Sequence, residues 1–144
     1  MNISVLGAGN GGCAVAADMS LKGHEVTLVK TSNSIHNENF KYLLENNGKI
    51  SLIEDGITKE TSIKKVTTDL SSISDSEVII IYIQSQYHES LIKRIIPYLK
   101  DGQILLFNPG YMSTAFALKH GVRKDIILAE AESSFIDCRI TSPG

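Results

Sequence analysis

Short apolar runs alternate with stretches of helical periodicity along the whole chain. The apolar runs have the length of β-strands and lie at residues 3–6, 26–29, 78–83, 104–107 and 126–129. The helical stretches lie at about residues 11–21, 33–46, 91–99 and 113–120. The run at 78–83 is apolar on both faces, which is typical of a central strand in a parallel sheet covered by helices on each side.

Strands separated by helices in this way predict βαβ units with right-handed crossovers. We therefore expect a single α/β domain, residues 1–144, with a doubly wound parallel sheet in the order 3-2-1-4-5-6. Asn33 or Ser34 is the expected cap of the second helix. Two further strands, at 50–53 and near 63–66, flank Asp55-Gly56, a dipeptide that predicts a β-hairpin.

Composition and charge exclude several classes of protein. The formal net charge of −2 provides no basic surface of the kind that binds nucleic acid. The longest apolar run, at 78–83, is far shorter than the roughly 20 residues that span a bilayer, and glycines interrupt the N-terminus where a secretory signal would lie. Cys13 and Cys138 have no zinc-ligand spacing, and free thiols are typical of the cytoplasm. We expect a cytoplasmic protein that binds neither nucleic acid nor membrane and holds no metal.

Residues 7–12 read Gly-Ala-Gly-Asn-Gly-Gly directly after the first predicted strand. This GxGxxG motif opens a helix within about 30 residues of a second strand, which is the context of a dinucleotide-binding Rossmann fold. The first glycine permits the tight turn, the second lets the backbone approach a pyrophosphate, and the third lets the helix pack against the sheet. The alternative is a glycine-rich turn without a ligand. The residues predicted to bind the cofactor here are Gly7, Gly9, Asn10, Gly11 and Gly12.

The end of the second strand indicates which nicotinamide cofactor binds. An Asp or Glu at this place holds the ribose 2′-hydroxyl of NAD. This strand is followed instead by Lys30, Thr31 and Ser32, which offer a cation and hydrogen-bond donors to the 2′-phosphate of NADP. We therefore predict NADP as the cofactor, with NAD as the alternative. A solvated lysine in a polar loop is the structural alternative.

Further candidates follow the later strands. Gln84 and Ser85 come directly after the strand at 78–83, where they are expected to bind the ribose or carboxamide of the cofactor. Asn108, in an Asn-Pro-Gly turn, is a candidate for the nicotinamide or a substrate carboxylate, and a purely structural turn is equally consistent. His88 and Glu130 are candidates for substrate contacts. Their alternatives are a surface or N-terminal-helix histidine and a solvated carboxylate.

Several segments together resemble the octopine/nopaline (opine) dehydrogenase family. They are GAGNGG at 7–12, HEVTL at 24–28, QSQYHES at 84–90, NPG at 108–110, and AEAE at 129–132 with Cys138-Arg139 beyond it. The resemblance covers the N-terminal half of that family and implies reductive joining of an amino acid to a 2-oxo acid, with hydride from NAD(P)H. In the family a helical C-terminal domain carries the catalytic histidine and most substrate contacts, so the resemblance places the catalytic residues outside this chain.

The same N-terminal pattern is similar to those of glycerol-3-phosphate dehydrogenase and ketopantoate reductase. A domain of either type is an alternative, as is a non-catalytic NAD(P)-binding regulatory module. The sequence stops at Thr141–Gly144, on a connector just after a strand. We therefore expect an incomplete site for a small-molecule substrate, completed by a second domain or a separate chain. A homo-oligomer is also consistent with the sequence.

Overall fold

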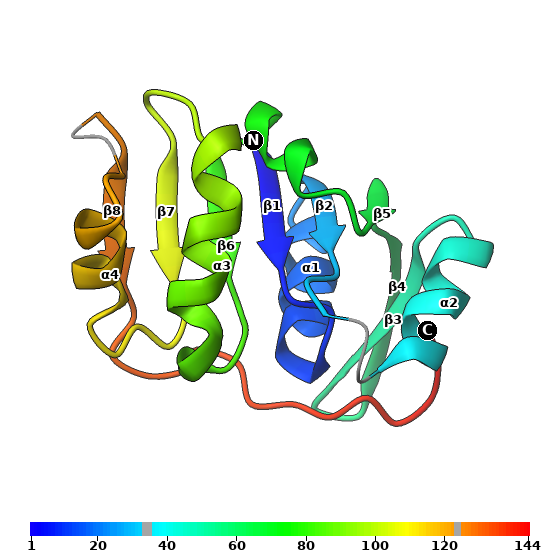
Figure 1. Ribbon diagram of the computed structural model, residues 1–144. Helices are drawn as coiled ribbons and strands as arrows, with labels where there is room; N and C mark the ends of the chain where they lie inside the picture. Colours follow the sequence, from blue (N-terminus) through cyan, green and yellow to red (C-terminus); the bar gives the residue numbers. More distant parts are fainter. Residues whose placement is uncertain (33–35, 123–124) are drawn as a thin grey trace.

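A computed structural model describes residues 1–32, 36–122 and 125–144 and is built around one parallel sheet (Figure 1). Its strands lie side by side in the order β5-β2-β1-β6-β7-β8. Counted along the chain within this sheet, that order is 3-2-1-4-5-6, so the predicted doubly wound topology is confirmed. The strands are β1 (Asn2–Leu6), β2 (Glu25–Val29), β5 (Lys65–Thr67), β6 (Val78–Ile81), β7 (Ile104–Phe107) and β8 (Ile127–Glu130).

Helices cover both faces of this sheet. The α-helices are α1 (Asn10–Leu21), α2 (Asn37–Glu45), α3 (His88–Ile95) and α4 (Ser113–Lys119), and the 3-10 helices are η1 (Leu70–Asp75), η2 (Ser85–Tyr87) and η3 (Ile96–Tyr98). Side chains alternate between the faces along each strand. On β6, Ile80 packs into the core that contains Val15 of α1, whereas Ile79 and Ile81 pack into the core that contains Ile92 of α3.

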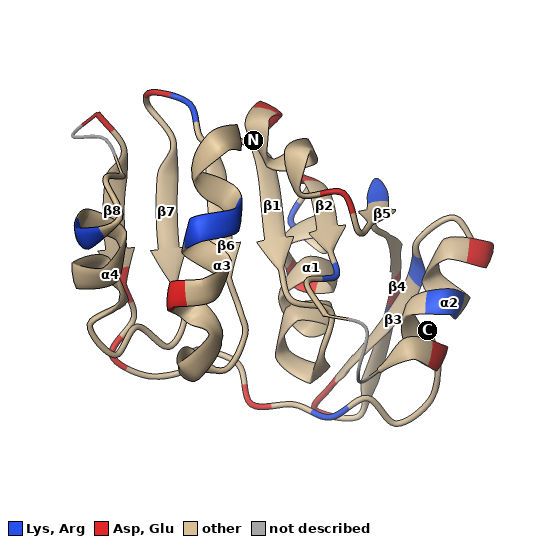
Figure 2. Cartoon of the chain, viewed as in Figure 1, with Lys and Arg blue, Asp and Glu red and all other residues tan. Residues whose placement is uncertain are grey.

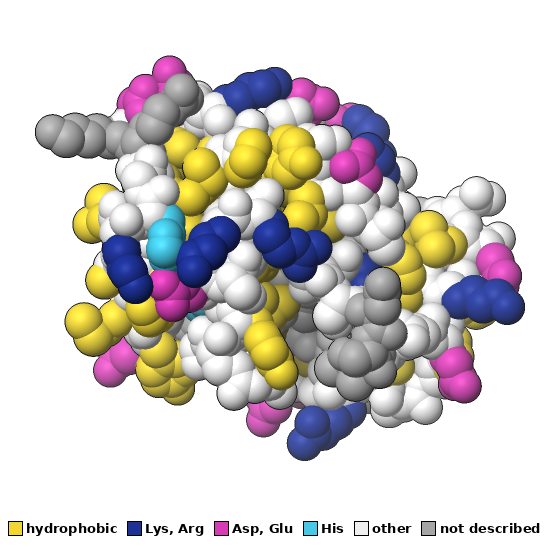
Figure 3. All heavy atoms as spheres, in the orientation of Figure 1, with side chains coloured by type: hydrophobic (Ala, Val, Ile, Leu, Met, Phe, Trp, Pro, Cys, Tyr) yellow, Lys and Arg dark blue, Asp and Glu magenta, His cyan; other side chains and the backbone are white. Residues whose placement is uncertain are grey.

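The central strands β1, β6 and β7 carry no charged side chain, and most charges lie on helices and loops (Figure 2). Glu89 of α3 binds α4 through Lys119 (3.0 Å) and His120 (2.7 Å), and Lys93 lies 4.0 Å from the same carboxylate. Basic side chains gather around a histidine and an acidic group on the face that α3 and α4 present (Figure 3). The hydrogen bonds from His120 and Lys119 lower the pKa of Glu89 to about 2.

The predicted hairpin is present, but its second strand is not the expected one. Strands β3 (Lys49–Glu54) and β4 (Ile57–Ser62) pair antiparallel around Asp55-Gly56, whose φ angles of 51° and 77° suit a type I′ turn. Most of β4 is exposed, so its sequence has no alternation of apolar and polar residues that would predict a strand. The piece expected near 63–66 instead contributes to β5, the edge strand of the parallel sheet.

Element ends also differ from the expected ones. The strand predicted at 78–83 ends at Ile81, and Tyr82 and Ile83 belong to the loop that follows it. The helix with the apolar stripe at 91–99 has His88 in its first turn, as expected, but after Ile95 it continues as a 3-10 turn containing Pro97. The expected caps Asn33 and Ser34 lie outside the described residues. Within the described ranges, each helix is too short or too polar to cross a bilayer.

Candidate functional site

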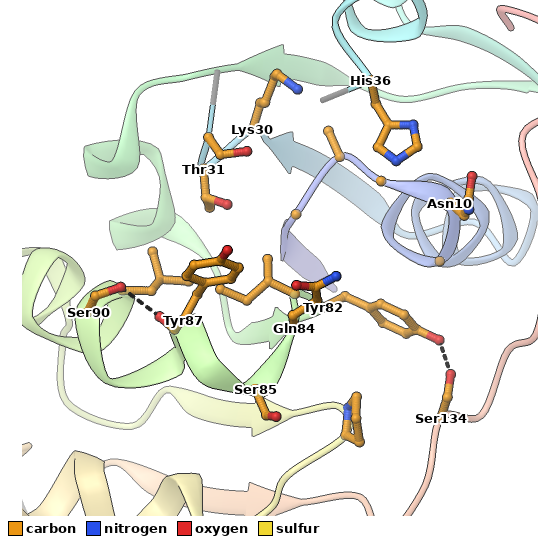
Figure 4. A pocket seen from close by; sticks show the side chains of 18 of the residues that line it. Asn10, Lys30, Thr31, His36, Tyr82, Gln84, Ser85, Tyr87, Ser90 and Ser134 are labelled. Carbon is orange, nitrogen blue, oxygen red and sulfur yellow. Dashed lines mark hydrogen bonds between the residues drawn. The ribbon is translucent and has the colours of Figure 1, made fainter. Parts of the chain in front are cut away.

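A cavity of about 950 Å³ opens at the carboxyl edge of the sheet (Figure 4). Its walls come from the loops that follow β1, β2 and β6, together with one side of α3. Nine of the residues predicted to bind cofactor line it: Gly7, Gly9, Asn10, Gly11, Lys30, Thr31, Ser32, Gln84 and Ser85. Segments far apart in the sequence therefore meet in one hollow at the expected end of the strands.

The glycine loop is shaped by close backbone contacts. Gly7 has a φ of +123°, and a Cβ atom there would overlap the carbonyl oxygen of Tyr82. A Cβ at Gly12 would overlap the carbonyl oxygen of Gly7, so this glycine lets α1 pack against β1, and it is not among the cavity-lining residues. A Cβ at Gly9 would meet only ordinary contact, 3.6 Å from the His36 ring. The loop is thus open to the cavity at Gly9.

Helix α1 begins directly at this open point. Its first backbone bond runs from the N–H of Cys13 to the carbonyl of Gly9, which is the N-cap residue. The preceding N–H groups cannot bond within the helix and carry the positive end of its dipole. The edge of the cavity at Gly9 therefore has the character of an anion site.

The loop after β2 and the helix α3 bring positive charge to the cavity. Lys30 is only 7% exposed, its Nζ lies 5.5 Å from the centre of the Phe40 ring, and burial lowers its pKa. Arg94, which is exposed on α3, donates from Nη1 to the Thr31 carbonyl oxygen at 3.1 Å. The sequence from Val29 to Ile35 contains no carboxylate.

The segment after β8 is attached beside the glycine loop. The Tyr82 hydroxyl donates to the carbonyl oxygen of Ile136 at 2.8 Å and contacts the Ser134 hydroxyl (Figure 4). The side-chain oxygen of Asn10 accepts from the Ile140 N–H at 3.1 Å. The side chain of Asn10 therefore binds this segment, while its backbone remains at the start of α1.

His88 does not line the cavity, contrary to the expectation of a substrate contact. It is fully buried, its ring lies 5.6 Å from that of Phe107, and burial lowers its pKa. Its Nε2 donates to the Ile83 carbonyl oxygen at 3.0 Å, and its Nδ1 lies 2.5 Å from the Ser113 hydroxyl oxygen. His88 therefore joins α3 to the start of α4, because the first turn of α3 directs this side chain inward.

Glu130 and Asn108 also differ from the simplest expectation. The Glu130 carboxylate accepts from the N–H groups of Met112, at 3.0 Å, and Thr114, so it holds the start of α4. Burial raises the pKa of Glu130, but these hydrogen bonds outweigh it and the pKa is lowered. Asn108 is fully buried, and neither polar atom of its side chain has a partner among the described residues. Its neighbour Pro109 lines the cavity.

Several lining residues were not predicted from the sequence. His36 lines the cavity beside Gly9. Tyr87, Leu91 and Arg94 present one side of η2 and α3 to the cavity. Their spacing of four and three residues was visible as a helical stripe, but the pattern alone does not tell which partner the stripe faces.

Comparison with known proteins agrees with this geometry. The family model described as ketopantoate reductase PanE/ApbA matches residues 3–131. The chain belongs to that family. It is an NAD(P)-binding domain of the oxidoreductase type, and the predicted relationship to ketopantoate reductase is confirmed.

Individual relatives extend the comparison. The chain is 29% identical to opine dehydrogenase from Arthrobacter sp. (strain 1C), over 98% of this chain and 39% of that protein. An octopine dehydrogenase structure with NADH and L-arginine superimposes with a TM-score of 0.78 at 20% identity, over 100% of this chain and 38% of the other. A ketopantoate reductase structure from Ralstonia eutropha JMP134 superimposes with a TM-score of 0.68 at 19% identity, over 90% of this chain and 40% of the other. The chain spans about two fifths of the length of these relatives.

Proposed function

We propose that the cavity binds NADP(H), with its pyrophosphate at Gly9 and its adenosine 2′-phosphate beside the loop after β2. The observation that carries this proposal is the geometry at Gly9, which has no side chain to cover the backbone and which lies at the N-terminus of α1. The first N–H groups of that helix have no partner within it and can bind phosphate. Lys30 and Arg94 supply positive charge near the 2′-phosphate, and the loop has no carboxylate to repel it. An octopine dehydrogenase that superimposes on the chain contains NADH, which makes NAD the alternative.

The remaining residues fit the other end of the same molecule. Gln84 and Ser85 line the cavity at the end of β6, beside the switch point between β1 and β6. The buried amide of Asn108 has no partner among the described residues, and unpaired buried amides are costly. The Asn108 side chain is not among the residues that line the cavity, so Pro109 is the residue of this turn that a bound cofactor would contact. A bound nicotinamide would supply a hydride, and Gln84 and Ser85 would hold its ribose or carboxamide.

Isothermal titration of the chain with NADPH and with NADH under identical conditions tests the proposal. We expect both to bind and NADPH to bind more tightly, because only NADPH carries the 2′-phosphate. Tighter binding of NADH would overturn the assignment of NADP. Binding of neither would overturn the cofactor site itself.

We further propose that the domain serves a reductase of the opine type, in which an imine of an amino acid and a 2-oxo acid accepts the hydride. This rests on the match to opine dehydrogenase along 98% of the chain. The family match favours a second candidate, reduction of a 2-oxo acid of the ketopantoate kind. Two chimeras test the choice, with this domain in place of its counterpart in the Arthrobacter opine dehydrogenase or in the Ralstonia ketopantoate reductase. The opine assignment requires an active first chimera and an inactive second one. The opine assignment requires NADPH oxidation that depends on both the amino acid and the 2-oxo acid.

A further inference from the structure

One side of α3 forms a wall of the cavity that faces the loop after β2. Tyr87, Leu91 and Arg94 all line the cavity, and their spacing places them on one helical face. Leu91 is buried, whereas Tyr87 is 54% exposed and Arg94 is exposed. The wall therefore passes from an apolar base to a cationic rim.

Two cations lie at this rim, and their surroundings differ. Lys30 is almost completely buried, its ammonium lies near the Phe40 ring, and burial lowers its pKa. Arg94 is exposed, and a guanidinium stays charged in any protein environment. Of these two cations, Arg94 is the better placed to meet an incoming dianion.

The bond between Arg94 and Thr31 fixes the guanidinium at the end of β2. The contact with the Thr31 carbonyl, at 3.1 Å, uses one of the five N–H groups that a guanidinium carries. A planar guanidinium matches the geometry of a phosphate and binds it with paired hydrogen bonds. The hydroxyls of Thr31 and Ser32 line the same part of the cavity and offer further donors.

We propose that Arg94 is the residue that selects the 2′-phosphate of NADP, with Lys30 in a supporting position behind it. This inference rests on the proposed function, because it assigns a specificity residue to the same site. It predicts that removing the Arg94 charge changes the ratio of NADPH to NADH affinity more than removing the charge of Lys30.

The test compares R94Q with K93Q, a matched control. Lys93 directly precedes Arg94 in α3, carries the same charge and is also exposed. It pairs with Glu89 and is not among the residues that line the cavity. Titration with NADPH and NADH should show R94Q weakening NADPH by about tenfold to a hundredfold, the effect of losing a hydrogen bond to a charged group. NADH affinity should stay within about twofold, and K93Q should match the wild type for both. R94K should retain part of the preference, and K30Q should lower the ratio less than R94Q.

The outcomes separate this inference from the proposed function. If the wild type prefers NADPH and R94Q keeps that preference, Arg94 does not select the phosphate, although the site stands. If R94Q weakens both cofactors equally while its circular dichroism is unchanged, Arg94 positions the Thr31 loop and the inference is wrong. If the wild type binds neither cofactor, the proposed function itself fails.

Discussion

Replacing Gly9 with alanine should separate cofactor binding from folding. Gly9 has φ −90° and ψ −167°, which alanine adopts without strain, and the added Cβ would lie 3.6 Å from the His36 ring. The methyl group therefore fits the protein, but it projects into the cavity at the place where we put the pyrophosphate. Gly12→Ala is the contrasting change, because its Cβ would overlap the carbonyl oxygen of Gly7.

Gly9→Ala should mainly weaken cofactor binding, whereas Gly12→Ala should mainly lower stability. For Gly9→Ala, a weaker N-cap costs about 0.5–1 kcal/mol, and the smaller entropy of the unfolded chain returns about 0.4–1 kcal/mol. The free energy of unfolding should thus change by less than about 1 kcal/mol. If the methyl group removes even one hydrogen bond to phosphate, the loss is about 1.5–3 kcal/mol, or roughly tenfold to a hundredfold in Kd. For Gly12→Ala, overpacking against rigid backbone costs about 1–3 kcal/mol or more of stability.

Urea denaturation followed by circular dichroism measures the stability, and titration with NADPH measures the affinity. Wild-type affinity in Gly9→Ala would refute the placement of the pyrophosphate at this residue. Strong destabilisation of Gly9→Ala would refute the reading that the loop is open there. A Gly12→Ala protein as stable as the wild type would show that α1 and β1 are not packed as closely as described.

Three further outcomes test the packing around the site. Gln103→Ala should lower the free energy of unfolding by about 2–4 kcal/mol, because this buried side chain bonds the carbonyls of Ile73 and Ser76 at the end of η1 and the Lys100 N–H. The exposed Gln86→Ala should change it by less than about 0.5 kcal/mol. Burial lowers the pKa of His88 below 6.5, so the unfolded chain binds the proton more readily, and wild-type stability should fall as the pH drops below 6.5. Urea midpoints at pH 8, 6 and 5 check this against His88→Gln, and a parallel decline in both proteins would contradict it. The pKa of Glu89 is lowered from 4.5 to about 2. The stability advantage of the wild type over Glu89→Gln should therefore be present at pH 6 and shrink between pH 4.5 and about 2. A difference that stays constant over this pH range would contradict the ion pairs of Glu89.

The sequence predicts the parallel sheet and much of the cavity because both depend on local patterns. Buried parallel strands need continuous apolar runs, and the carboxyl ends of such strands meet at one edge. The polar residues that directly follow β1, β2 and β6 therefore reach the cavity without knowledge of side-chain packing. Gly9 and Gln84 are found in this way, each at the first turn after its strand.

What sequence reasoning misses depends on contacts between distant segments. The buried His88 bonds Ser113, 25 residues away, and Glu130 bonds the backbone at the start of α4. Arg94 meets the loop after β2 across 63 residues. Strand β4 is missed for a different reason, since a mostly exposed strand has no apolar alternation to find.

Gly11 shows how the two kinds of constraint meet in one loop. It is not one of the three glycines of the GxGxxG motif, yet a Cβ there would overlap the Tyr82 ring. The same ring carries the hydroxyl that bonds the Ile136 carbonyl, while Asn10, next to Gly11, bonds the Ile140 N–H. The glycine loop therefore has one side open for phosphate and another side filled by Tyr82, which ties it to the segment after β8. These contacts hold the segment after β8 against the start of α1, beside the place proposed for the pyrophosphate.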